Sequence, residues 1–400
     1  MQYLKDGSIT SVKGFKAAGI FCGIKKAKKD LALIYSTVPC NAAGTYTLNK
    51  VKAAPTLISK KSVNDGNLIQ AVLVNSGNAN ACTGEIGFAD AFKTRDYCAD
   101  KLGIVKESVL VSSTGVIGVP LPVETMLKGI DAIVPALSEE GGLDAAEAIL
   151  TTDLKTKSFA LEVLLSTGKV TIGGICKGSG MIAPNMATML AFIGTDARID
   201  KQLLQSLLLN AVNLSFNCIT VDGDTSTNDM VILMANGLSE LSVSEGTEDE
   251  KIFFDALTDI CTEMAKSIVV DGEGATKLVQ IDVKNARSIA DANLTAKAIA
   301  NSPLVKTAFY GEDANWGRIL SAAGNSGAEF DPEHVSVYFD DVAVLLPNYN
   351  IVIDEVTAKA VISKYEFTVT IDLNAGNYSV RWWTCDFSED YIKINARYRT

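Results

Sequence analysis

The amino-acid sequence predicts an α+β protein rather than a doubly wound parallel sheet. Strand-like and helix-like segments are mixed along the 400 residues, and several strands are followed directly by another strand. Regular alternation of strand and helix would instead indicate parallel βαβ units. No internal repeat or low-complexity linker marks a domain boundary, and this length fits two domains or one large domain of unusual topology.

The first half of the chain is predicted to contain three strands, two helices and a hairpin. The strands are apolar runs that end at Gly, Pro or Asn. The second helix begins after a Gly-Gly pair, and the first arm of the hairpin shows alternation before a turn at Ser166–Lys169. The strands are 30–36, 67–77 and the start of 107–122, the helices are 123–137 and 143–150, and the hairpin is 158–176.

The second half begins with a buried strand and ends in a strand-rich region. Its longest helix stops at a Gly-rich break, and its last two strands flank an Asn-Ala-Gly-Asn turn. The alternating run Tyr391–Tyr398 is expected to join the sheet at the end of the chain. The strands are 188–196, 276–283, 367–373 and 377–384, and the helices surround Leu203–Val212 and cover 248–270.

Composition limits the partners and the compartment. The formal net charge is −11, whereas nucleic acids and anionic membranes are bound by basic faces. No apolar run reaches the ~20 residues of a membrane span, and the N-terminus lacks a signal or transit pattern. The eight cysteines show no C-x-x-C spacing, which favours reduced thiols in a cytoplasmic protein. We therefore expect no nucleic acid and no membrane as partner.

His334 is the only histidine. A His-dependent triad would have to use this residue, and a zinc site would have one imidazole at most. A single histidine beside a strand is more often structural than functional, so we assign it no role. We expect no metal site, no bound cofactor and a chemistry that runs without imidazole.

The segment 177–190, KGSGMIAPNMATML, is the most informative about chemistry. A phosphate loop is excluded because G-x-x-x-x-G-K-[ST] is absent. The run 178–183 fits the dinucleotide pattern G-x-G-x-x-A, but Pro184 and a strand starting near Thr188 leave no room for the required helix. The remaining interpretation is a Gly-rich, Pro-kinked loop that brings Ala187 and Thr188 to the start of a buried strand.

This arrangement suits an N-terminal threonine nucleophile. A threonine hydroxyl needs an adjacent base, and cutting the Ala187–Thr188 bond would free an α-amino group on the same residue. The reference pKa of that group, about 7.7–8.0, matches neutral pH better than the pKa of lysine. Most Ala-Thr pairs at strand starts are plain structure, so this pattern alone leaves both interpretations open.

The same segment closely resembles the cleavage-site motif of the bifunctional ornithine acetyltransferase/N-acetylglutamate synthase family, the arginine-biosynthesis ArgJ family. Further family landmarks follow in family order and span essentially the whole chain. They are VPCNAAGTYTLNKVKAAP (38–55), NSGNANACTG (75–84), STGVIGVPLP (113–122), TTD (151–153), NDM (228–230), VDGEGATK (270–277), YGEDANWGRI (310–319) and the terminal YIKINARYRT. The resemblance therefore rests on many motifs.

The resemblance implies a layered α/β/β/α fold of the type shared with self-processing aminopeptidases such as DmpA. It implies self-cleavage into chains 1–187 and 188–400, which stay associated as a heterotetramer with two of each. It also implies ping-pong transfer of acetyl from N-acetylornithine to glutamate through an acetyl-threonine ester. Some members also accept acetyl-CoA as a co-substrate, and no residue in the sequence decides this point.

The resemblance further implies the site. Thr114 and Gly115 look like the oxyanion hole, one donating a hydroxyl and the other a backbone N–H. Lys177 suits the substrate carboxylate, and Glu273 could receive the cationic end of ornithine. The implied substrate-binding residues are Thr151, Lys177, Thr188, Glu273, Asn395 and Thr400. The polar-loop residues left outside the predicted site are Asp224, Asn228, Asp229, Asn315 and Arg318.

Two alternative functions remain open. A self-processing aminopeptidase or amidase on the same scaffold would resolve the acyl-threonine with water instead of an amine. A non-catalytic protein that binds a small ligand is the alternative from another class. An intact Thr188 together with Thr114 and Gly115 argues against the second alternative.

Overall fold

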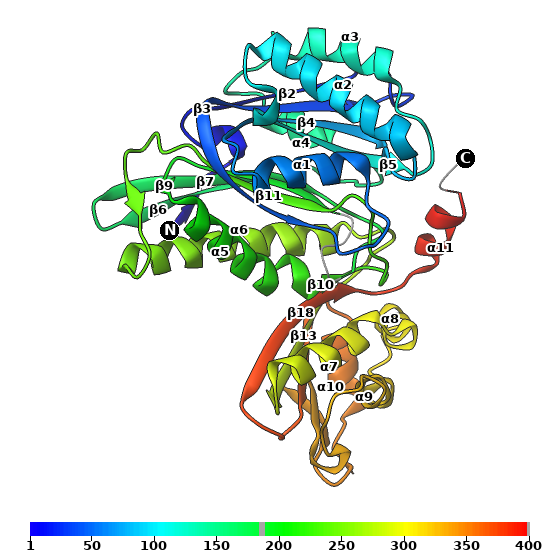
Figure 1. Ribbon diagram of the computed structural model, residues 1–400. Helices are drawn as coiled ribbons and strands as arrows, with labels where there is room; N and C mark the ends of the chain where they lie inside the picture. The colour runs from blue at the N-terminus through cyan, green and yellow to red at the C-terminus, as the bar shows by residue number, and fades with distance from the viewer. Residues whose placement is uncertain (184–188, 398–400) are drawn as a thin grey trace. The chain divides into compact units, whose positions relative to one another are not determined.

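The computed structural model describes residues 1–183 and 189–397 (Figure 1). The chain forms two compact units. The first comprises Met1–Asn217 and Asp224–Ala265, and the second comprises Cys218–Gly223 and the chain from Lys266 onward. The predicted cleavage point before Thr188 therefore falls inside the first unit and is not a boundary between the two.

The first unit is built on one continuous path of paired strands, β1-β6-β7-β8-β11-β3-β4-β5, with β2 also paired to β3. Parallel and antiparallel pairs are mixed along this path, as the α+β prediction requires. The strands are β1 (Gln2–Tyr3), β2 (Phe15–Ile20), β3 (Leu31–Tyr46), β4 (Ile69–Asn78), β5 (Val109–Val116), β6 (Lys157–Leu165), β7 (Gly168–Lys177), β8 (Leu190–Thr195) and β11 (Met230–Ala235), with β9 (Arg198–Ile199) and β12 (Ser242–Val243) paired separately.

Strand β3 divides this path into two sheet layers. It is 16 residues long, and its first half pairs with β2 and β4 while its second half pairs with β11. The register with β4 breaks between Tyr35 and Cys40, around Pro39, which has no N–H to donate to a ladder. One strand thus belongs to both layers.

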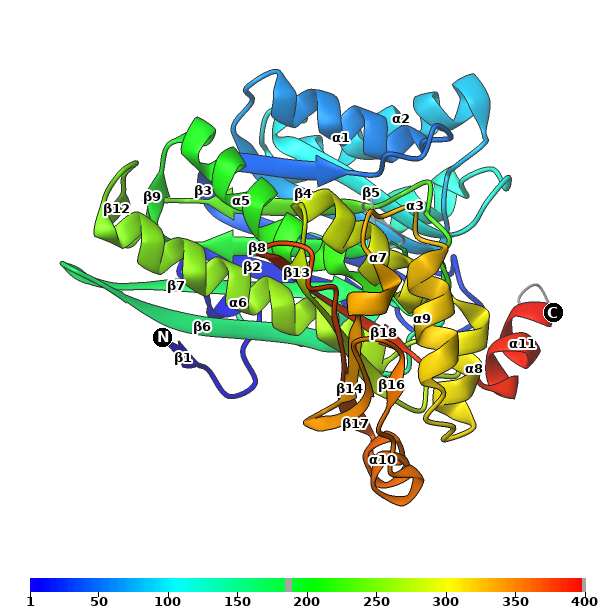
Figure 2. The same cartoon turned by 90° about the horizontal axis from the view of Figure 1, so that it is seen from below.

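Helices α1, α2 and α3 cover the outer face of one layer, and α5 and α6 cover that of the other (Figures 1 and 2), whereas α4 packs against β2, β3, β6 and β7 and contributes to the inner core. Leu31 and Leu33 of β3 pack into a core shared with α1, α2 and α3, whereas Ala32 and Ile34 face an inner core shared with β8 and β11. On the other side, α5 packs against β3, and α6 accepts a contact from Cys176 of β7. The predicted α/β/β/α layering is confirmed. The helices are α1 (Ala54–Asn64), α2 (Gly84–Leu102), α3 (Val123–Ile133), α4 (Gly142–Ala148), α5 (Lys201–Leu214) and α6 (Glu248–Val270).

Most of the predicted elements of this unit are present, including the β6–β7 hairpin and the full extent of α6. The sequence prediction contains neither α1 nor α2. Both helices bury small or polar side chains, such as Ser59 and Ser62 in α1 and Gly87 and Thr94 in α2. They therefore lack the apolar stripe by which a helix is recognised in a sequence.

The second unit is a sheet of order β10-β18-β13-β17-β14-β15-β16 with helices packed against it. Its strands are β10 (Ile219–Thr220), β13 (Leu278–Ala286), β14 (Ser336–Phe339), β15 (Val342–Leu346), β16 (Asn350–Ile351), β17 (Glu366–Asp372) and β18 (Tyr378–Cys385). Its helices are α7 (Ile289–Asn301), α8 (Pro303–Tyr310), α9 (Trp316–Gly324), α10 (Glu355–Ile362) and α11 (Glu389–Ala396). In the described part of the chain, no helix is long and apolar enough to cross a membrane.

The two strands that flank the Asn-Ala-Gly-Asn turn are not neighbours in the sheet. β13 lies between them, parallel to β17 and antiparallel to β18. The turn passes around the end of β13, where the backbone N–H groups of Ala375 and Gly376 both donate to the carbonyl of Asn285. The segments were predicted as strands, but local sequence does not show that a third strand separates them.

The prediction of a strand at the end of the chain is wrong. Residues Glu389–Ala396 form α11, which begins at Ser388, whose hydroxyl accepts the backbone N–H of Asp390. A serine followed by acidic residues in the first turn is a favourable helix start. Ile392 is 69% exposed, so the alternation in this segment does not mark a buried sheet face.

Candidate active site

Thr114 and Gly115 lie at the end of β5, in tight contact with β4. Thr114 is buried, and Gly115 is paired with Gly77. Gly115 has φ +134, and a Cβ atom there would lie 2.4 Å from the backbone of Gly77. Only glycine allows this approach, so the predicted oxyanion pair occupies a backbone position that the two strands fix.

Asn228 attaches this strand end to the segment that precedes β11. Its side-chain amide donates to the carbonyl oxygens of Ser113, at 2.8 Å, and Ala79, at 2.7 Å. The Ser113 hydroxyl in turn donates to Asn75. Ser113 directly precedes Thr114, so Asn228 holds the backbone on one side of the predicted oxyanion hole.

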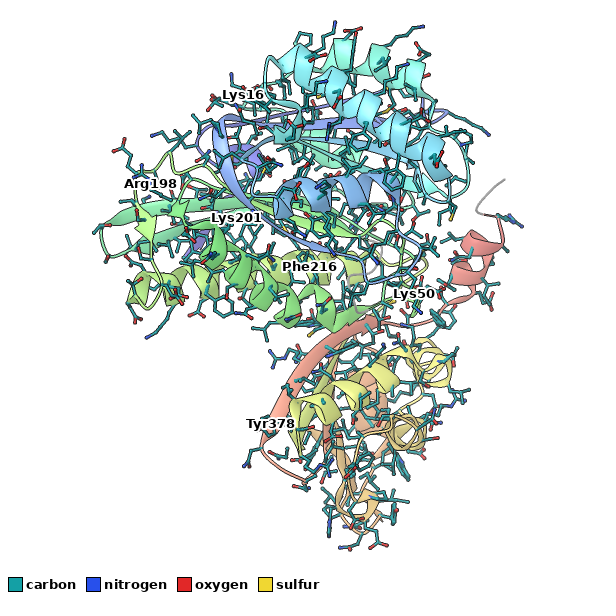
Figure 3. All side chains as sticks on the ribbon, in the orientation of Figure 1. Lys16, Lys50, Arg198, Lys201, Phe216 and Tyr378 are labelled. Atoms are coloured by element: carbon teal, nitrogen blue, oxygen red, sulfur yellow. The ribbon has the colours of Figure 1, made fainter. Side chains whose placement is uncertain are left out.

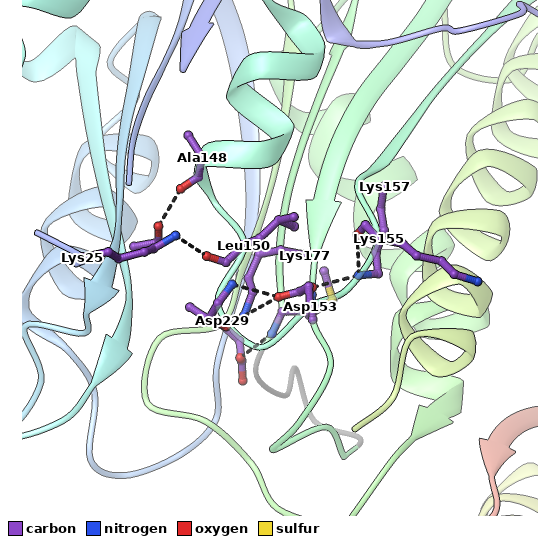
Figure 4. A network of polar contacts seen from close by, with 12 residues as sticks. Lys25, Ala148, Leu150, Asp153, Lys155, Lys157, Lys177 and Asp229 are labelled. Carbon is purple, nitrogen blue, oxygen red and sulfur yellow. Dashed lines mark hydrogen bonds and ion pairs between the residues drawn. The ribbon is translucent and has the colours of Figure 1, made fainter. Parts of the chain in front are cut away.

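Thr151 and Lys177 are brought together by a buried network at the end of β7. The Lys177 ammonium donates to the Thr151 hydroxyl at 2.8 Å and lies 3.6 Å from the Asp153 carboxylate. Asp153 also accepts the Lys157 ammonium at 2.8 Å and the backbone N–H groups of Gly178 and Thr151. Figure 4 shows Lys157 and Lys177 pointing toward Asp153.

This network keeps Asp153 ionised. Burial alone raises the pKa of the Asp153 carboxyl, but the charges of Lys177 and Lys157 and the hydrogen bonds outweigh burial and hold it well below its usual range. Buried charges persist when they are paired and hydrogen-bonded. Asp153 thus fixes both lysines, and it directs Lys177 toward Thr151.

The Asp229 side chain bonds to the segment directly before β8. Its carboxylate oxygen Oδ1 accepts the backbone N–H of Met189 at 2.9 Å, and Met189 directly follows Thr188. Asp229 is fully buried, and Oδ2 has no hydrogen-bond partner in the described residues. Burial raises the pKa of the Asp229 carboxyl well above its ordinary value, against the opposing hydrogen bond from Met189 and the charge of Lys177.

The sequence prediction left Asn228 and Asp229 outside the site and did not assign Asp153 a role. The structure shows that the two consecutive residues 228 and 229 bond to Ser113 and Met189, the neighbours of Thr114 and Thr188. The sequence marked them only by the NDM landmark (228–230) and by a polar loop directly before a buried strand, neither of which assigns them a role. Ala187, Thr188 and Thr400 lie outside the described residues.

In the second unit, two predicted substrate-binding residues meet although they are far apart in the sequence. The side-chain amide of Asn395 on α11 donates to Glu273 at 2.8 Å. Glu273 is buried in the loop between α6 and β13, where the next residue, Gly274, has φ +72 and its carbonyl accepts the Ser388 hydroxyl. The N-terminal end of α11 is thus attached beside Glu273.

Other parts of the first unit contribute no predicted site residue. A cavity of about 840 Å³ opens between β3, α1 and α5, beside Lys201, which Figure 3 labels. Its lining includes none of Thr114, Thr151 and Lys177. Within residues 1–183 and 189–397, no group of three or more His, Cys, Asp or Glu side chains could hold a metal ion.

A reacting acyl group needs donors for its developing oxyanion and a cation for the carboxylate of its substrate. One layered unit contains groups suited to both needs, and the protein is of the acyltransferase class. The model of the ArgJ family matches residues 16–400. The chain therefore belongs to the ArgJ family.

Relatives match along nearly the full chain. An arginine biosynthesis bifunctional protein ArgJ from Caldanaerobacter subterraneus is 49% identical, over 99% of this chain and 99% of its own. The protein of the same description from Symbiobacterium thermophilum is 50% identical, over 100% of both chains. Full coverage at this identity shows a common family.

Solved structures match in part. Ornithine acetyltransferase from Mycobacterium tuberculosis, in complex with ornithine, is 39% identical over 46% of this chain and 97% of its own, with a TM-score of 0.43. The L-aminopeptidase D-Ala-esterase/amidase of Ochrobactrum anthropi is 13% identical over 67% of this chain and 86% of its own, with a TM-score of 0.42.

Proposed function

We propose that the protein is a self-cleaving acetyltransferase that moves an acetyl group from N-acetylornithine to glutamate in arginine biosynthesis. Family membership supports the reaction. The residue assignment rests on the pair Asn228–Asp229. The Asn228 side chain bonds to Ser113, and the Asp229 side chain bonds to Met189. This pair would hold the nucleophile Thr188 opposite the oxyanion donors Thr114 and Gly115.

The chemistry proceeds in two half-reactions. The Thr188 hydroxyl attacks the acetyl carbonyl of N-acetylornithine, and its proton passes through the Thr188 α-amino group to the departing amine as the C–N bond breaks. The amine of glutamate then attacks the acetyl ester, the C–O bond breaks, and the threonine oxygen regains a proton. Thr114 and Gly115 donate hydrogen bonds to the oxyanion in both steps, each worth about 2.7–4 kcal/mol.

The substrate is held by charged groups of opposite sign. Lys177 and Thr151 bind the carboxylate, since the Lys177 ammonium is already directed by Asp153. Glu273, with Asn395 donating to it, receives the cationic end of ornithine, and Thr400 completes the site. No bound cofactor takes part, and the assay below decides whether acetyl-CoA also serves as an acetyl donor.

Self-cleavage uses the same groups on the Ala187–Thr188 bond. The fragments 1–187 and 188–400 stay together as a heterotetramer with two of each, in the cytoplasm. The pairing of β7 with β8 supports their association, because each strand comes from a different fragment.

Intact-mass measurement tests this proposal. The purified protein should contain two chains split before Thr188, and N-acetylornithine without glutamate should add one acetyl group to the 188–400 chain. Glutamate should then remove that group, while acetyl-CoA should replace N-acetylornithine only if the enzyme is bifunctional.

Two variants at one position separate the hydroxyl from the rest of the side chain. Thr188→Ala should remain a single chain without transferase activity, whereas Thr188→Ser should still cleave because its hydroxyl is retained. An active preparation with no new N-terminus at Thr188 would refute the mechanism. An acetyl adduct that water removes as fast as glutamate does would favour the amidase alternative.

A further inference from the structure

Lys25 lies in the loop between β2 and β3, and the buried carboxylate of Asp30 fixes the conformation of this loop. Asp30 accepts the backbone N–H groups of four consecutive residues, from Cys22 to Lys25, at 2.7–3.1 Å. A carboxylate that accepts several backbone N–H groups holds a loop in one conformation. Hydrogen bonds within the protein therefore fix the position of the Lys25 backbone.

The side chain of Lys25 extends from Gly77 in β4 to Leu150, the residue before Thr151. Its stem lies against Gly77, where an added Cβ atom would be 2.9 Å from the Lys25 Cγ, and Gly77 is the partner of Gly115. Its ammonium donates to the carbonyl of Leu150 at 2.7 Å (Figure 4) and to that of Lys29 at 2.8 Å. Lys25 and Lys177 thus bond to the consecutive residues Leu150 and Thr151.

The ammonium of Lys25 has no carboxylate within ion-pair distance among the described residues; its two partners are neutral carbonyl groups. Burial lowers the pKa of Lys25 to about 8, with Lys177 and Lys28 acting in the same direction and Asp30 and Asp153 against it. Asp30 is already bonded to four backbone groups. A half-buried cation of this kind is stabilised by an anionic ligand.

We propose that Lys25 binds the side-chain carboxylate of the acyl acceptor glutamate, while Lys177 binds the α-carboxylate. The inference rests on the proposed transfer to glutamate. N-acetylornithine carries one carboxylate and glutamate carries two, and the site offers two ammonium groups, those of Lys25 and Lys177, which bond to the consecutive residues Leu150 and Thr151. Lys25 then determines the specificity for the second substrate and is not needed for the first half-reaction.

In the experiment, N-acetylornithine first acetylates the enzyme. Glutamate and glutamine are then compared as acceptors of this acetyl group. Glutamine has the same shape without the side-chain charge. In Lys25→Met, kcat/KM for glutamate should fall about ten- to a hundredfold, the range expected for losing a hydrogen bond to a charged group. The value for glutamine, the self-cleavage and the acetylation by N-acetylornithine should stay unchanged.

The control is Lys26→Met, because Lys26 is an exposed neighbour in the same loop. It should behave as wild type, and Lys25→Arg should retain a preference for glutamate. Equal losses with both acceptors, or an unchanged ratio, would overturn the role of Lys25. A wild-type enzyme that N-acetylornithine does not acetylate would instead refute the proposed function itself.

The wild-type protein supplies a second measurement that needs no variant. The profile of kcat/KM for the acceptor against pH reports groups of the acetylated enzyme and of the free acceptor, and the amino groups of the two acceptors largely cancel in their ratio. The ratio of glutamate to glutamine should therefore fall as the pH rises above about 8, where Lys25 loses its proton. A ratio independent of pH from 7 to 9.5 would exclude Lys25 as the discriminating group.

Discussion

The consecutive residues Asn228 and Asp229 bond to the backbone of two different segments of the chain. Asn228 donates to the backbone beside Thr114, and Asp229 accepts from the backbone that follows Thr188. In the proposed mechanism, neither residue needs to touch a substrate to position the chain beside Thr114 and the chain that follows Thr188. Positioning of this kind is sensitive, because an error of about 1 Å at a reacting centre can cost a hundredfold in rate.

Asp153 has a comparable role for the lysines, and its protonation can be tested. Its pKa in the folded protein is lowered, so its contribution to stability is present above its pKa in the unfolded chain, about 3.9, and is lost as the pH falls. Asp153→Asn should therefore lower the free energy of unfolding at pH 7 by about 3–5 kcal/mol, the usual result of breaking a buried ion pair. The difference from wild type should shrink below about pH 4.

Urea unfolding of both proteins in the Thr188→Ala background measures this effect on a single chain. Asp144→Asn is the matched control, because Asp144 pairs with Lys29 at the surface and its side chain is 57% exposed. An exposed pair contributes about 0–1 kcal/mol. Equal effects of the two substitutions would show that the Asp153 network does not stabilise the fold.

At the scale of residues, the sequence predicted the members of the site but not their connections. Thr151 and Lys177 do meet, and so do Glu273 and Asn395. Asp153, Asn228 and Asp229 carry the connections. The landmarks TTD and NDM contain them, but their roles were not assigned, because many of their partners are backbone atoms. A contact with backbone depends on how the chain folds and leaves no residue pattern to recognise.

At the scale of elements, apolar runs ending at Gly, Pro or Asn predicted strands of both sheet layers, and the apolar face of residues 248–270 predicted the long helix α6. Such patterns failed for α1 and α2, whose buried faces are small or polar, and for α11. In α11 the signals for the start of a helix, Ser388 and the acidic residues that follow it, outweighed a short alternating run. The order of strands around β13 was also not predictable, because pairing depends on contacts distant in the sequence.

The assignment of α11 as a helix leads to a prediction for its end. Asn395→Ala removes the amide that donates to Glu273, so KM for N-acetylornithine should rise several-fold, while self-cleavage remains complete. Asn395→Asp should have a larger effect, because it places a second carboxylate beside Glu273 at the distance now bridged by a hydrogen bond, 2.8 Å. Initial rates with varied N-acetylornithine measure both effects.

Lys393→Ala provides the control on the same helix, because Lys393 pairs only with Glu389 and Asp390 at the surface in the described residues. It should leave KM unchanged. If Asn395→Ala also leaves KM unchanged, the contact with Glu273 is structural, and Asn395 should be removed from the proposed site.

At the scale of the whole molecule, the proposed cleavage point lies between two strands that pair with each other. β7 pairs with β8 from Ile172 to Lys177, β8 pairs with β11, and β11 pairs with β3. The fragments 1–187 and 188–400 therefore interleave in one sheet and share one core. Cutting the connection changes the number of chains without removing any of these buried contacts.

This arrangement changes how unfolding depends on concentration. When two chains separate on unfolding, each tenfold rise in protein concentration adds about 1.4 kcal/mol to the stability of the assembled state. The midpoint of urea unfolding should therefore rise more steeply with concentration in the cleaved wild type than in uncleaved Thr188→Ala, whatever larger assembly both proteins form. Circular dichroism at protein concentrations that span two orders of magnitude measures both slopes. Equal slopes would mean that the fragments do not separate when the sheet unfolds, or that the wild-type chain is not cut.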